Sequence, residues 1–378
     1  MIRVLQVLGT ISLGGAESRV MDLYRKIDKD KIQFDFLVTE GTGNHYKSEI
    51  ENMGGRVYYL PAFRIVNYLT YRKACVDFFA SHSSFDESGK RISEYSAVHG
   101  HMTSTASIYL PIAAGYGVPL TIAHARSAGV DPGLKGMATN VLRHSLYKKC
   151  DMMIACSDEA GDAVFGPKSD YVFMPNAIDV KEYVYNETSR SNIRNQYGIS
   201  DDEILIGHVG SFRYAKNHDL IIDIFKKISE TDNGDKYRLM LVGDGTLRSE
   251  IEAKVSNLGL SDKVIFTGNQ SPVAPYYSAF DILLFPSHYE GMPGTVVEAQ
   301  ASGLPCIISD AITKQVIITD LVRVMSLKDS VDNWVEAIKT MLSKYSDRNV
   351  DEELESTMYN VNMQVDYYSE LYTNRGIL

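Results

Sequence analysis

The segment 287–299 combines acidic residues, glycines and a proline in an order that could bind a diphosphate. It follows an apolar run at 281–285, which is typical of a buried strand, and it leads into a helical pattern. The first turn of a helix presents unpaired backbone N–H groups and the positive end of the helix dipole, which together attract phosphate. Gly291 and Gly294 allow that backbone to approach a ligand closely, and Pro293 suits the first helical turn.

The two carboxylates of this segment, Glu290 and Glu298, stand eight positions apart. If most of the interval is helical, it rises by about 12 Å, whereas the acid–base pair of a glycosidase needs a separation of roughly 5 to 9.5 Å. The spacing instead suits two hydroxyl contacts along one extended ligand, such as the ribose and the hexose of a nucleotide sugar. A single glutamate here more often pairs or caps on a solvated helix face, so the prediction depends on the whole segment.

A cationic loop follows the predicted strand 204–209. It contains Arg213 and Lys216, and charged side chains of this kind make the strong, charge-assisted hydrogen bonds that hold a diphosphate. Both side chains could extend beyond the carboxyl end of the strand. A solvated surface charge is the alternative interpretation of Arg213.

The first half of the chain places two glycines, Gly14 and Gly15, after the predicted strand 3–8 and at the start of a helical pattern. The G-x-G-x-x-G spacing of a dinucleotide site is absent, and no acidic residue ends the second strand. Taken alone, these glycines predict a tight turn.

Polar side chains also end two later apolar runs, where His101, His124 and Arg126 are found. A histidine at a strand end could hydrogen-bond a sugar or stabilise charge on a leaving phosphate, although it is more often structural. His99 and His101 form an H-x-H pair that could ligate a metal, but no Asp or Glu is spaced nearby to complete such a site.

These candidate residues follow runs of Val, Ile, Leu and Phe that alternate with longer amphipathic segments. The runs are nearly continuous in apolar residues, which is the pattern of parallel strands buried on both faces, and the segments between them can form crossover helices. The sequence therefore predicts an α/β fold with a doubly wound parallel sheet in each half. The predicted strands are 3–8, 33–38, 56–60, 119–123, 152–156, 171–174, 204–209, 237–242, 263–267, 281–285 and 304–308.

A polar stretch at 183–203 without a strand pattern separates the two halves. At 378 residues the chain exceeds one ordinary domain, so two domains that face a ligand-binding cleft are expected. The predicted parts are a first domain over 1–185, a second domain over 186–358, and a C-terminal helix over 359–378 that packs back on the first domain.

Composition narrows the class of protein. The net charge of −10 argues against a nucleic-acid-binding surface, and four cysteines without metal or disulfide spacing favour the reducing cytoplasm. The N-terminus lacks the features of a signal peptide, and no apolar run reaches the roughly 18 to 20 residues that span a bilayer. The sequence thus predicts a cytoplasmic protein. A short basic strip could nevertheless contact an anionic membrane surface, and it is formed by Arg143, His144, Lys148 and Lys149.

Several motifs in chain order resemble those of retaining GT-B glycosyltransferases of family 4, especially bacterial exopolysaccharide and capsule enzymes. Glu290 and Glu298 match the E-x7-E element of that family. The other matching segments are Gly14–Glu17 (the "GGAE" loop), Met174–Asp179, Leu241–Gly245 (the "VGDG" turn) and Ala299–Pro305. The ordered set spans most of the chain, which makes chance a poor explanation.

Two positions depart from the family pattern. Ala177 stands where the family has a glycine, and Ser211 stands where its phosphate-binding arginine is expected, five residues before the matching Lys216. Arg213 lies in the same loop and could supply the missing guanidinium from a shifted position.

The resemblance implies a GT-B fold of two Rossmann-like domains, with the nucleotide sugar bound mainly by the second. It implies catalytic roles for Glu290, Lys216, Arg213 and His124, with Glu298 on the ribose hydroxyls. The acceptor side is expected to include His101 and Arg126. The remaining residues expected at the donor are Gly14, Gly15, Gly243, Gly291, Met292, Pro293, Gly294 and Thr295. No metal and no other cofactor is implied.

The expected activity is retaining transfer of a hexose from a nucleoside-diphosphate sugar, by family habit a UDP-sugar, to a saccharide hydroxyl. A polyprenyl-diphosphate-linked acceptor would suit a protein that touches the membrane surface. One alternative is a UDP-sugar 2-epimerase, which shares this architecture and needs no acceptor. A second is a non-catalytic partner of another transferase, for which Ser211 is the best argument. A nicotinamide dehydrogenase is disfavoured because the dinucleotide fingerprint is missing.

Overall fold

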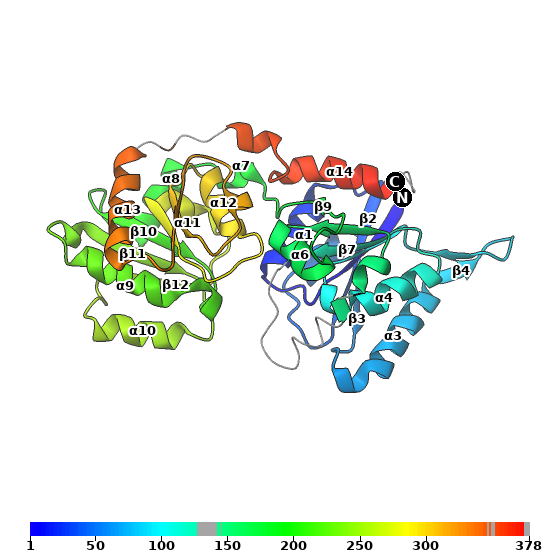
Figure 1. The fold of residues 1–378 in the computed structure, drawn as a ribbon. Coiled ribbons are helices and arrows are strands. Elements are labelled where there is room, and N and C mark those ends of the chain that lie inside the picture. The colour runs from blue at the N-terminus through cyan, green and yellow to red at the C-terminus, as the bar shows by residue number, and fades with distance from the viewer. Residues whose placement is uncertain (127–141, 144, 346–347, 349–351, 374–378) are drawn as a thin grey trace. The chain divides into compact units, whose positions relative to one another are not determined.

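The chain forms two compact units in the computed structural model. The first contains Met1–Ala177 and Val361–Leu378, and the second contains Ile178–Asn360. In each unit, helices cover a parallel sheet (Figure 1). The structure describes residues 1–126, 142–143, 145–345, 348 and 352–373.

The sheet of the first unit has seven strands within the described residues, in the order β3-β2-β1-β6-β7-β8-β9. All neighbouring strands are parallel, and the direction of winding reverses between β1 and β6. Ligands of open α/β sheets bind beyond the carboxyl ends of the strands at such a reversal. The strands are β1 (Ile2–Val7), β2 (Ile32–Thr39), β3 (Val57–Leu60), β6 (Ala97–Gly100), β7 (Thr121–Ala125), β8 (Met152–Ala155) and β9 (Val172–Phe173).

Helices and one small hairpin complete the first unit. The hairpin pairs β4 (Ser83–Phe85) with β5 (Arg91–Ser93). The start of one helix, at Asp158, is capped by the Ser157 hydroxyl, which accepts a hydrogen bond from the Ala160 N–H. The helices are α1 (Gly15–Lys26), α2 (Lys47–Asn52), α3 (Tyr68–Ser81), α4 (Thr103–Gly115), α6 (Asp158–Phe165) and α14 (Val361–Thr373), with single turns η1 (Ile65–Asn67) and η2 (Leu146–Lys148).

The last helix, α14, belongs to the first unit although it follows the whole second unit in sequence (Figure 1). It packs against α1, and the Tyr372 ring meets the Phe34 ring edge-on at 6.0 Å. The Gln364 side chain donates a hydrogen bond to the Pro175 carbonyl at 2.7 Å. The predicted return of the C-terminal helix to the first domain is therefore confirmed.

The second unit repeats the doubly wound pattern with six strands in the described residues, ordered β12-β11-β10-β13-β14-β15. They are β10 (Ile204–Val209), β11 (Tyr237–Val242), β12 (Val264–Gly268), β13 (Ile282–Phe285), β14 (Cys306–Ser309) and β15 (Val322–Met325). The helices are α7 (Val180–Tyr183), α8 (Glu187–Gln196), α9 (His218–Ser229), α10 (Arg248–Asn257), α11 (Ala274–Ala279), α12 (Gly294–Ala301) and α13 (Val331–Lys344), with single turns η3 (Tyr214–Lys216), η4 (Gly234–Lys236), η5 (Lys314–Val316) and η6 (Glu352–Ser356).

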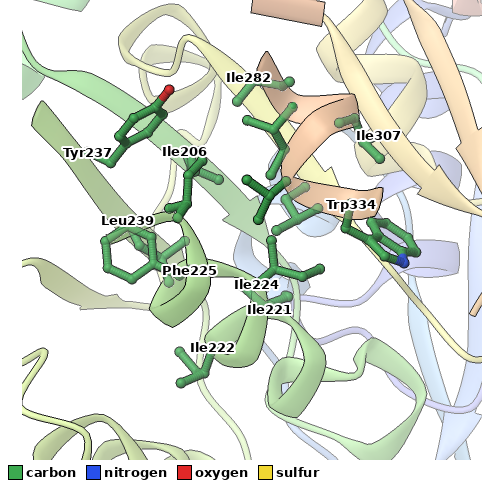
Figure 2. Close-up of a cluster of buried hydrophobic side chains, with 14 of the residues drawn as sticks. Ile206, Ile221, Ile222, Ile224, Phe225, Tyr237, Leu239, Ile282, Ile307 and Trp334 are labelled. Carbon is green, nitrogen blue, oxygen red and sulfur yellow. The ribbon is translucent and has the colours of Figure 1, made fainter. Parts of the chain in front are cut away.

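A continuous apolar core fixes the sheet of the second unit against α9 and α13 (Figure 2). Helix α9 places Ile221, Phe225 and Ile228 at helical spacing on the face toward the strands, and all three are buried. Trp334 enters the same core from α13. Each such side chain contributes roughly 1.5 to 3 kcal/mol when fully buried, so this packing holds the strand ends in place.

The structure confirms the predicted α/β class and the doubly wound sheets. Four strands, β4, β5, β6 and β15, are missing from the predicted set. In β15 the side chains alternate in exposure and Arg323 is exposed, so this edge strand lacks a continuous apolar run. Residues 178–185, assigned above to the first domain, lie in the second unit, where α7 packs against α11 and α12.

None of the helices within the described residues is long and apolar enough to cross a membrane.

Candidate functional site

The segment predicted to bind a diphosphate becomes a helix start in the second unit. Helix α12 begins at Gly294, directly after Pro293, whose backbone is extended. The Thr295 hydroxyl donates a hydrogen bond to the Val209 carbonyl at 3.3 Å, which ties the first turn of α12 to the carboxyl end of β10. The unpaired N–H groups of this turn are therefore held beside the strand ends.

Glu298 lies one turn into α12 and is buried. Its Oε2 accepts a hydrogen bond from the Tyr277 hydroxyl of α11 at 2.6 Å. Burial and the neighbouring carboxylate raise the pKa of Tyr277, so this hydroxyl stays protonated and continues to donate. A Cβ atom added at Gly294 would lie 3.5 Å from Glu298 Oε1, which places the carboxylate next to the helix start.

Glu290 lies outside the helix. It belongs to the loop before α12, so the interval between Glu290 and Glu298 is only partly helical. The estimate of about 12 Å for that interval assumed a mostly helical rise and does not hold.

Lys216 and Glu290, which are 74 positions apart in sequence, form an ion pair with Nζ and Oε1 2.6 Å apart. Each side chain keeps only 16% of its surface exposed, and the Lys216 ammonium also lies 4.7 Å from the centre of the Phe285 ring. Two of the residues predicted to be catalytic are thus brought together, with their charges compensating each other.

Three further contacts join the loop of Lys216 to the loop of Glu290. The His288 N–H donates to the Ala215 carbonyl at 2.8 Å, and the Asn217 side chain donates to the Pro286 carbonyl at 3.1 Å. The rings of Tyr214 and His288 stack at 4.5 Å. The ion pair therefore sits on two loops that support each other.

Arg213 is placed differently from Lys216. Its side chain is exposed and makes no hydrogen bond or ion pair with any residue that the structure describes. The structure does not bring Arg213 to the Lys216–Glu290 pair, and its predicted contact with phosphate stays a prediction.

The backbone at Gly243 can accommodate only a glycine. Its φ is +139°, its N–H donates to the Gly268 carbonyl at 2.9 Å, and a Cβ atom there would lie 2.2 Å from the Gly210 carbonyl oxygen. This close approach explains the glycine without a ligand. Met292 is buried, and Gly291 lies beside it in the loop before α12.

The first unit places Gly14 and Gly15 at the start of α1. A Cβ atom at Gly15 would meet nothing within 4 Å, whereas one at Gly14 would lie 2.4 Å from Glu17 Oε2. Burial raises the pKa of the Glu17 carboxyl, and nearby Arg126 partly opposes that rise. Gly15 is exposed, and its predicted approach to a ligand stays a prediction.

Three histidines gather at the carboxyl ends of β6 and β7. His99 Nε2 lies 3.0 Å from His124 Nδ1, and the rings of His99 and His101 stack at 4.3 Å. The Arg126 side chain donates from Nε to His101 Nδ1 at 3.2 Å and from Nη1 to Asn176 Oδ1 at 2.6 Å. Burial, and then the Arg126 charge, lower the pKa of His124 well below its usual range, so its ring is neutral at physiological pH.

Nitrogen atoms of His99, His101 and His124 lie within 4.8 Å of one another, and within the described residues this is the one group of histidines, cysteines or carboxylates with metal-like spacing. No acidic partner for the H-x-H pair is spaced nearby in the sequence. That His124 joins the pair was not predicted, because this depends on the parallel pairing of β6 with β7.

Two supporting side chains were also missed in sequence, Tyr277 beside Glu298 and Tyr372 beside His99. Tyr372 is 273 positions from its partner, and neither tyrosine stands in a motif.

The predicted basic strip falls partly outside the described residues, since His144 and 127–141 are among those not described. Of the rest, Arg143 is buried, and burial lowers its pKa, while Lys148 and Lys149 are exposed.

Comparison with known proteins agrees with this architecture. The profile described as Glycosyl transferases group 1 matches residues 189–356, and the profile of Glycosyltransferase Family 4 matches residues 13–182. The chain is 35% identical over 345 residues to the putative glycosyltransferase EpsF of Bacillus subtilis (strain 168), which covers 89% of this chain and 86% of that protein. It is 21% identical to the capsular polysaccharide biosynthesis glycosyltransferase CapH of Staphylococcus aureus, over the full length of both.

Solved structures share the fold at low sequence identity. The crystal structure of Anabaena Alr3699/HepE in complex with UDP and glucose has a TM-score of 0.77 at 16% identity, covering 98% of this chain and 99% of that one. The sucrose-phosphate synthase of Thermosynechococcus elongatus has a TM-score of 0.78 at 18% identity, covering 99% of each chain. With these folds, the two profiles and a relative 35% identical over most of both chains, this chain belongs to the group 1, family 4 glycosyltransferases and has the GT-B fold.

Proposed function

We propose that this glycosyltransferase moves a hexose from a nucleoside-diphosphate sugar, specifically a UDP-sugar, to a saccharide hydroxyl during exopolysaccharide or capsule synthesis, with retention of configuration. The observation that carries the proposal is the Lys216–Glu290 pair in the same unit as the α12 start, where Glu298 is fixed by Tyr277. The name of CapH and the UDP and glucose bound to HepE support the choice of pathway and donor.

The chemistry follows from where negative charge develops. As the sugar–phosphate bond breaks, charge grows on the leaving diphosphate, and stabilising that charge lowers the barrier most. In this proposal Lys216, the N–H groups at 291–295 and Arg213 meet that charge without a metal. Glu298 binds the ribose hydroxyls, Glu290 binds the donor sugar or its phosphate, and the neutral His124 binds the sugar.

The test starts with calorimetric binding of UDP, GDP and ADP. Sugars of the nucleotide that binds are then followed by NMR with and without a lipid-linked saccharide. Acceptor-dependent release of nucleoside diphosphate, with a product of unchanged anomeric configuration, is the expected result. Conversion of the sugar without acceptor would favour the 2-epimerase, and binding without either reaction across an acceptor panel would favour a non-catalytic partner.

An exposed apolar segment supports a lipid-linked acceptor and contact with the inner face of the membrane. Ile65, Val66 and Leu69, at η1 and the start of α3, expose 61%, 93% and 78% of their surfaces. Side chains of this size are rarely so exposed in a group without a partner, and Arg64 and Arg72 beside them are also exposed. Apolar groups flanked by cations suit a bilayer that contains anionic lipid.

A cavity of about 550 Å³ adjoins this apolar segment through Tyr68. Its lining includes three cations, Arg72, Arg91 and Lys149. Such a cavity suits the phosphates of an anionic lipid, and Lys149 also belongs to the basic strip of the sequence analysis.

Co-sedimentation with vesicles tests the membrane contact. The wild type should bind phosphatidylglycerol vesicles better than phosphatidylcholine vesicles, and Val66→Ser/Leu69→Ser should bind about tenfold less tightly. Val184→Ser is the control, because Val184 is 40% exposed and belongs to the second unit. Equal binding by all three proteins would contradict the contact.

A further inference from the structure

The hydrogen bonds around the histidines of the first unit have directions that can be assigned. The Arg126 guanidinium can only donate, so His101 Nδ1 must accept from it. Burial and the charges of His99 and Arg126 keep the His101 ring neutral, so the ring proton lies on Nε2. That proton is donated to Gln6 Oε1 at 2.9 Å.

Gln6 then orients its amide group. Because Oε1 accepts from His101, the Nε2 hydrogens point elsewhere. Burial raises the pKa of the Tyr372 hydroxyl well above its usual value, so it keeps its proton, and Gln6 opposes that rise only in part, as a hydrogen-bond donor would. The contact is loose, since Gln6 Nε2 makes no hydrogen bond of standard geometry within the described residues. Among the described residues, the Tyr372 hydroxyl has one hydrogen-bonding acceptor, His99 Nδ1, so the Tyr372 proton is directed to His99.

His99 transmits this direction to His124. The Tyr372 hydroxyl lies 2.7 Å from His99 Nδ1, and a hydroxyl that donates there leaves the proton of His99 on Nε2. His99 Nε2 lies 3.0 Å from His124 Nδ1 and donates to it. His124 is then an acceptor at Nδ1 and carries its own proton on Nε2. This Nε2 is buried and has no partner among the residues that the structure describes.

We propose that Tyr372 and His99 are positioning residues that fix His124 as the Nε2–H tautomer, which donates a hydrogen bond to an oxygen of the bound nucleotide sugar. The inference rests on the proposed function for the identity of that ligand. A metal site would need three free nitrogens, but among the described residues only His124 Nε2 is free in this trio. The chemistry that remains is that of a single neutral donor.

The structure offers a matched pair of variants one helical turn apart. Tyr372→Phe removes the hydroxyl that contacts His99. Tyr368→Phe removes a hydroxyl that is equally buried and has no partner among the described residues, from a ring stacked on Tyr372 at 5.6 Å. Both variants lose one oxygen from the same face of α14, so only the hydrogen bond to His99 distinguishes them.

The experiment measures the tautomer directly, by ¹⁵N NMR of histidine-labelled full-length protein. The wild type and Tyr368→Phe should show His124 protonated on Nε2, and Tyr372→Phe should shift part of the population to Nδ1. In transfer assays Tyr372→Phe should lower kcat about tenfold with little change in KM, while Tyr368→Phe stays within twofold.

Two outcomes would overturn the inference, namely a wild-type His124 protonated on Nδ1, or a His124 spectrum that Tyr372→Phe leaves unchanged. The wild-type spectrum is decisive even if Tyr372→Phe fails to fold. Equal losses of kcat in both variants would also overturn it, because they would indicate general packing of α14. If the tautomers behave as expected but the wild type transfers no sugar, the proposed function fails and the hydrogen-bond chain stands.

Discussion

The two units equip their strand ends with different kinds of polar group. In the first unit the candidate residues His99 and His124 are buried, neutral and joined by a chain of hydrogen bonds. In the second unit Lys216 and Glu290 are charged, partly exposed and paired with each other. Removing an ion from water costs far more than removing a neutral imidazole, so the deeper position uses histidine and the shallower one uses charge.

The two sets of side chains also differ in the kind of ligand group that each can bind. A charged pair can exchange its partner for a diphosphate, because the ligand offers charge of the same sign as Glu290. The hydrogen-bonded, neutral histidines of the first unit can instead donate to an oxygen that lies at the right distance and angle. In the proposed function, the charged pair of the second unit therefore meets the leaving group, and the histidines of the first unit meet the sugar.

The largest effect is expected at Lys216. Lys216→Ala should lower kcat/KM for acceptor-dependent release of nucleoside diphosphate by roughly 10² to 10³, which is typical for losing one donor that stabilises transition-state charge. The control is Lys226→Ala, because among the described residues Lys226 forms an ion pair only with Glu230, on an exposed face of α9. If Lys216→Ala lowers kcat/KM less than threefold, Lys216 does not stabilise the charge of the leaving diphosphate.

The next effect is expected at Glu298. Glu298→Gln should weaken binding of the nucleotide sugar about 10- to 100-fold, because it replaces a hydrogen bond to a charged group by a neutral one. Calorimetry measures the affinity, and thermal denaturation checks that the variant is folded. Glu252→Gln is the control, since Glu252 forms an ion pair only with Arg248 of α10 in the part of the chain that the structure describes. Unchanged binding in both variants would show that the donor site has been misplaced.

The pH dependence of stability distinguishes the units by their buried histidines. Burial lowers the pKa of His99, His101 and His124 in the first unit, and of His208 and His218 in the second, with His218 at about 4. In the unfolded chain each would titrate near 6.5. Below about pH 6.5 the unfolded state therefore binds more protons than the folded state. As the pH is lowered further, the free energy of unfolding decreases by about 1.4 kcal/mol per pH unit for each histidine.

Two probes can separate these contributions in denaturant titrations at pH 7.5, 6.5 and 5.5. Trp334 is the only tryptophan of the sequence and lies in the second unit, so its fluorescence follows that unit. Far-UV circular dichroism follows both units. The dichroism midpoint should fall more steeply with decreasing pH than the fluorescence midpoint. Parallel shifts of the two midpoints would contradict a greater number of neutral histidines in the first unit.

The smallest effect is expected at Arg213, which is exposed. Arg213→Ala should lower kcat/KM about three- to tenfold, because a screened, exposed cation contributes less than a partly buried one. Adding Ser211→Arg to this variant should recover activity by restoring the arginine where the family has it. If Arg213→Ala has no effect, Arg213 is an ordinary surface charge.

Sequence patterns predicted those parts of the molecule whose structure depends on residues close together in the sequence. The buried parallel strands and the helix start at Gly294 follow from apolar runs, glycines and a proline within a short segment. The pairing of Lys216 with Glu290 could not be read from either loop alone, because it depends on where β10 and β13 end side by side.

The supporting tyrosines escaped prediction for the same physical reason. Tyr277 reaches Glu298 through the packing of α11 on α12, and Tyr372 reaches His99 through the return of α14. Neither contact imposes a local spacing on the sequence. The edge strand β15 was missed because only part of it is buried.

The place of α14 in the chain has a consequence during synthesis. A ribosome completes the sheet of the first unit long before it reaches Tyr372, because all residues of the second unit come between them. At 5 to 20 residues per second, that delay is roughly 10 to 40 s. Throughout this interval the nascent first unit carries His99 without the hydroxyl of its last helix. Only a chain translated through α14 has the full set of hydrogen bonds, so an interrupted translation product would be left without the orientation of His124 that we infer.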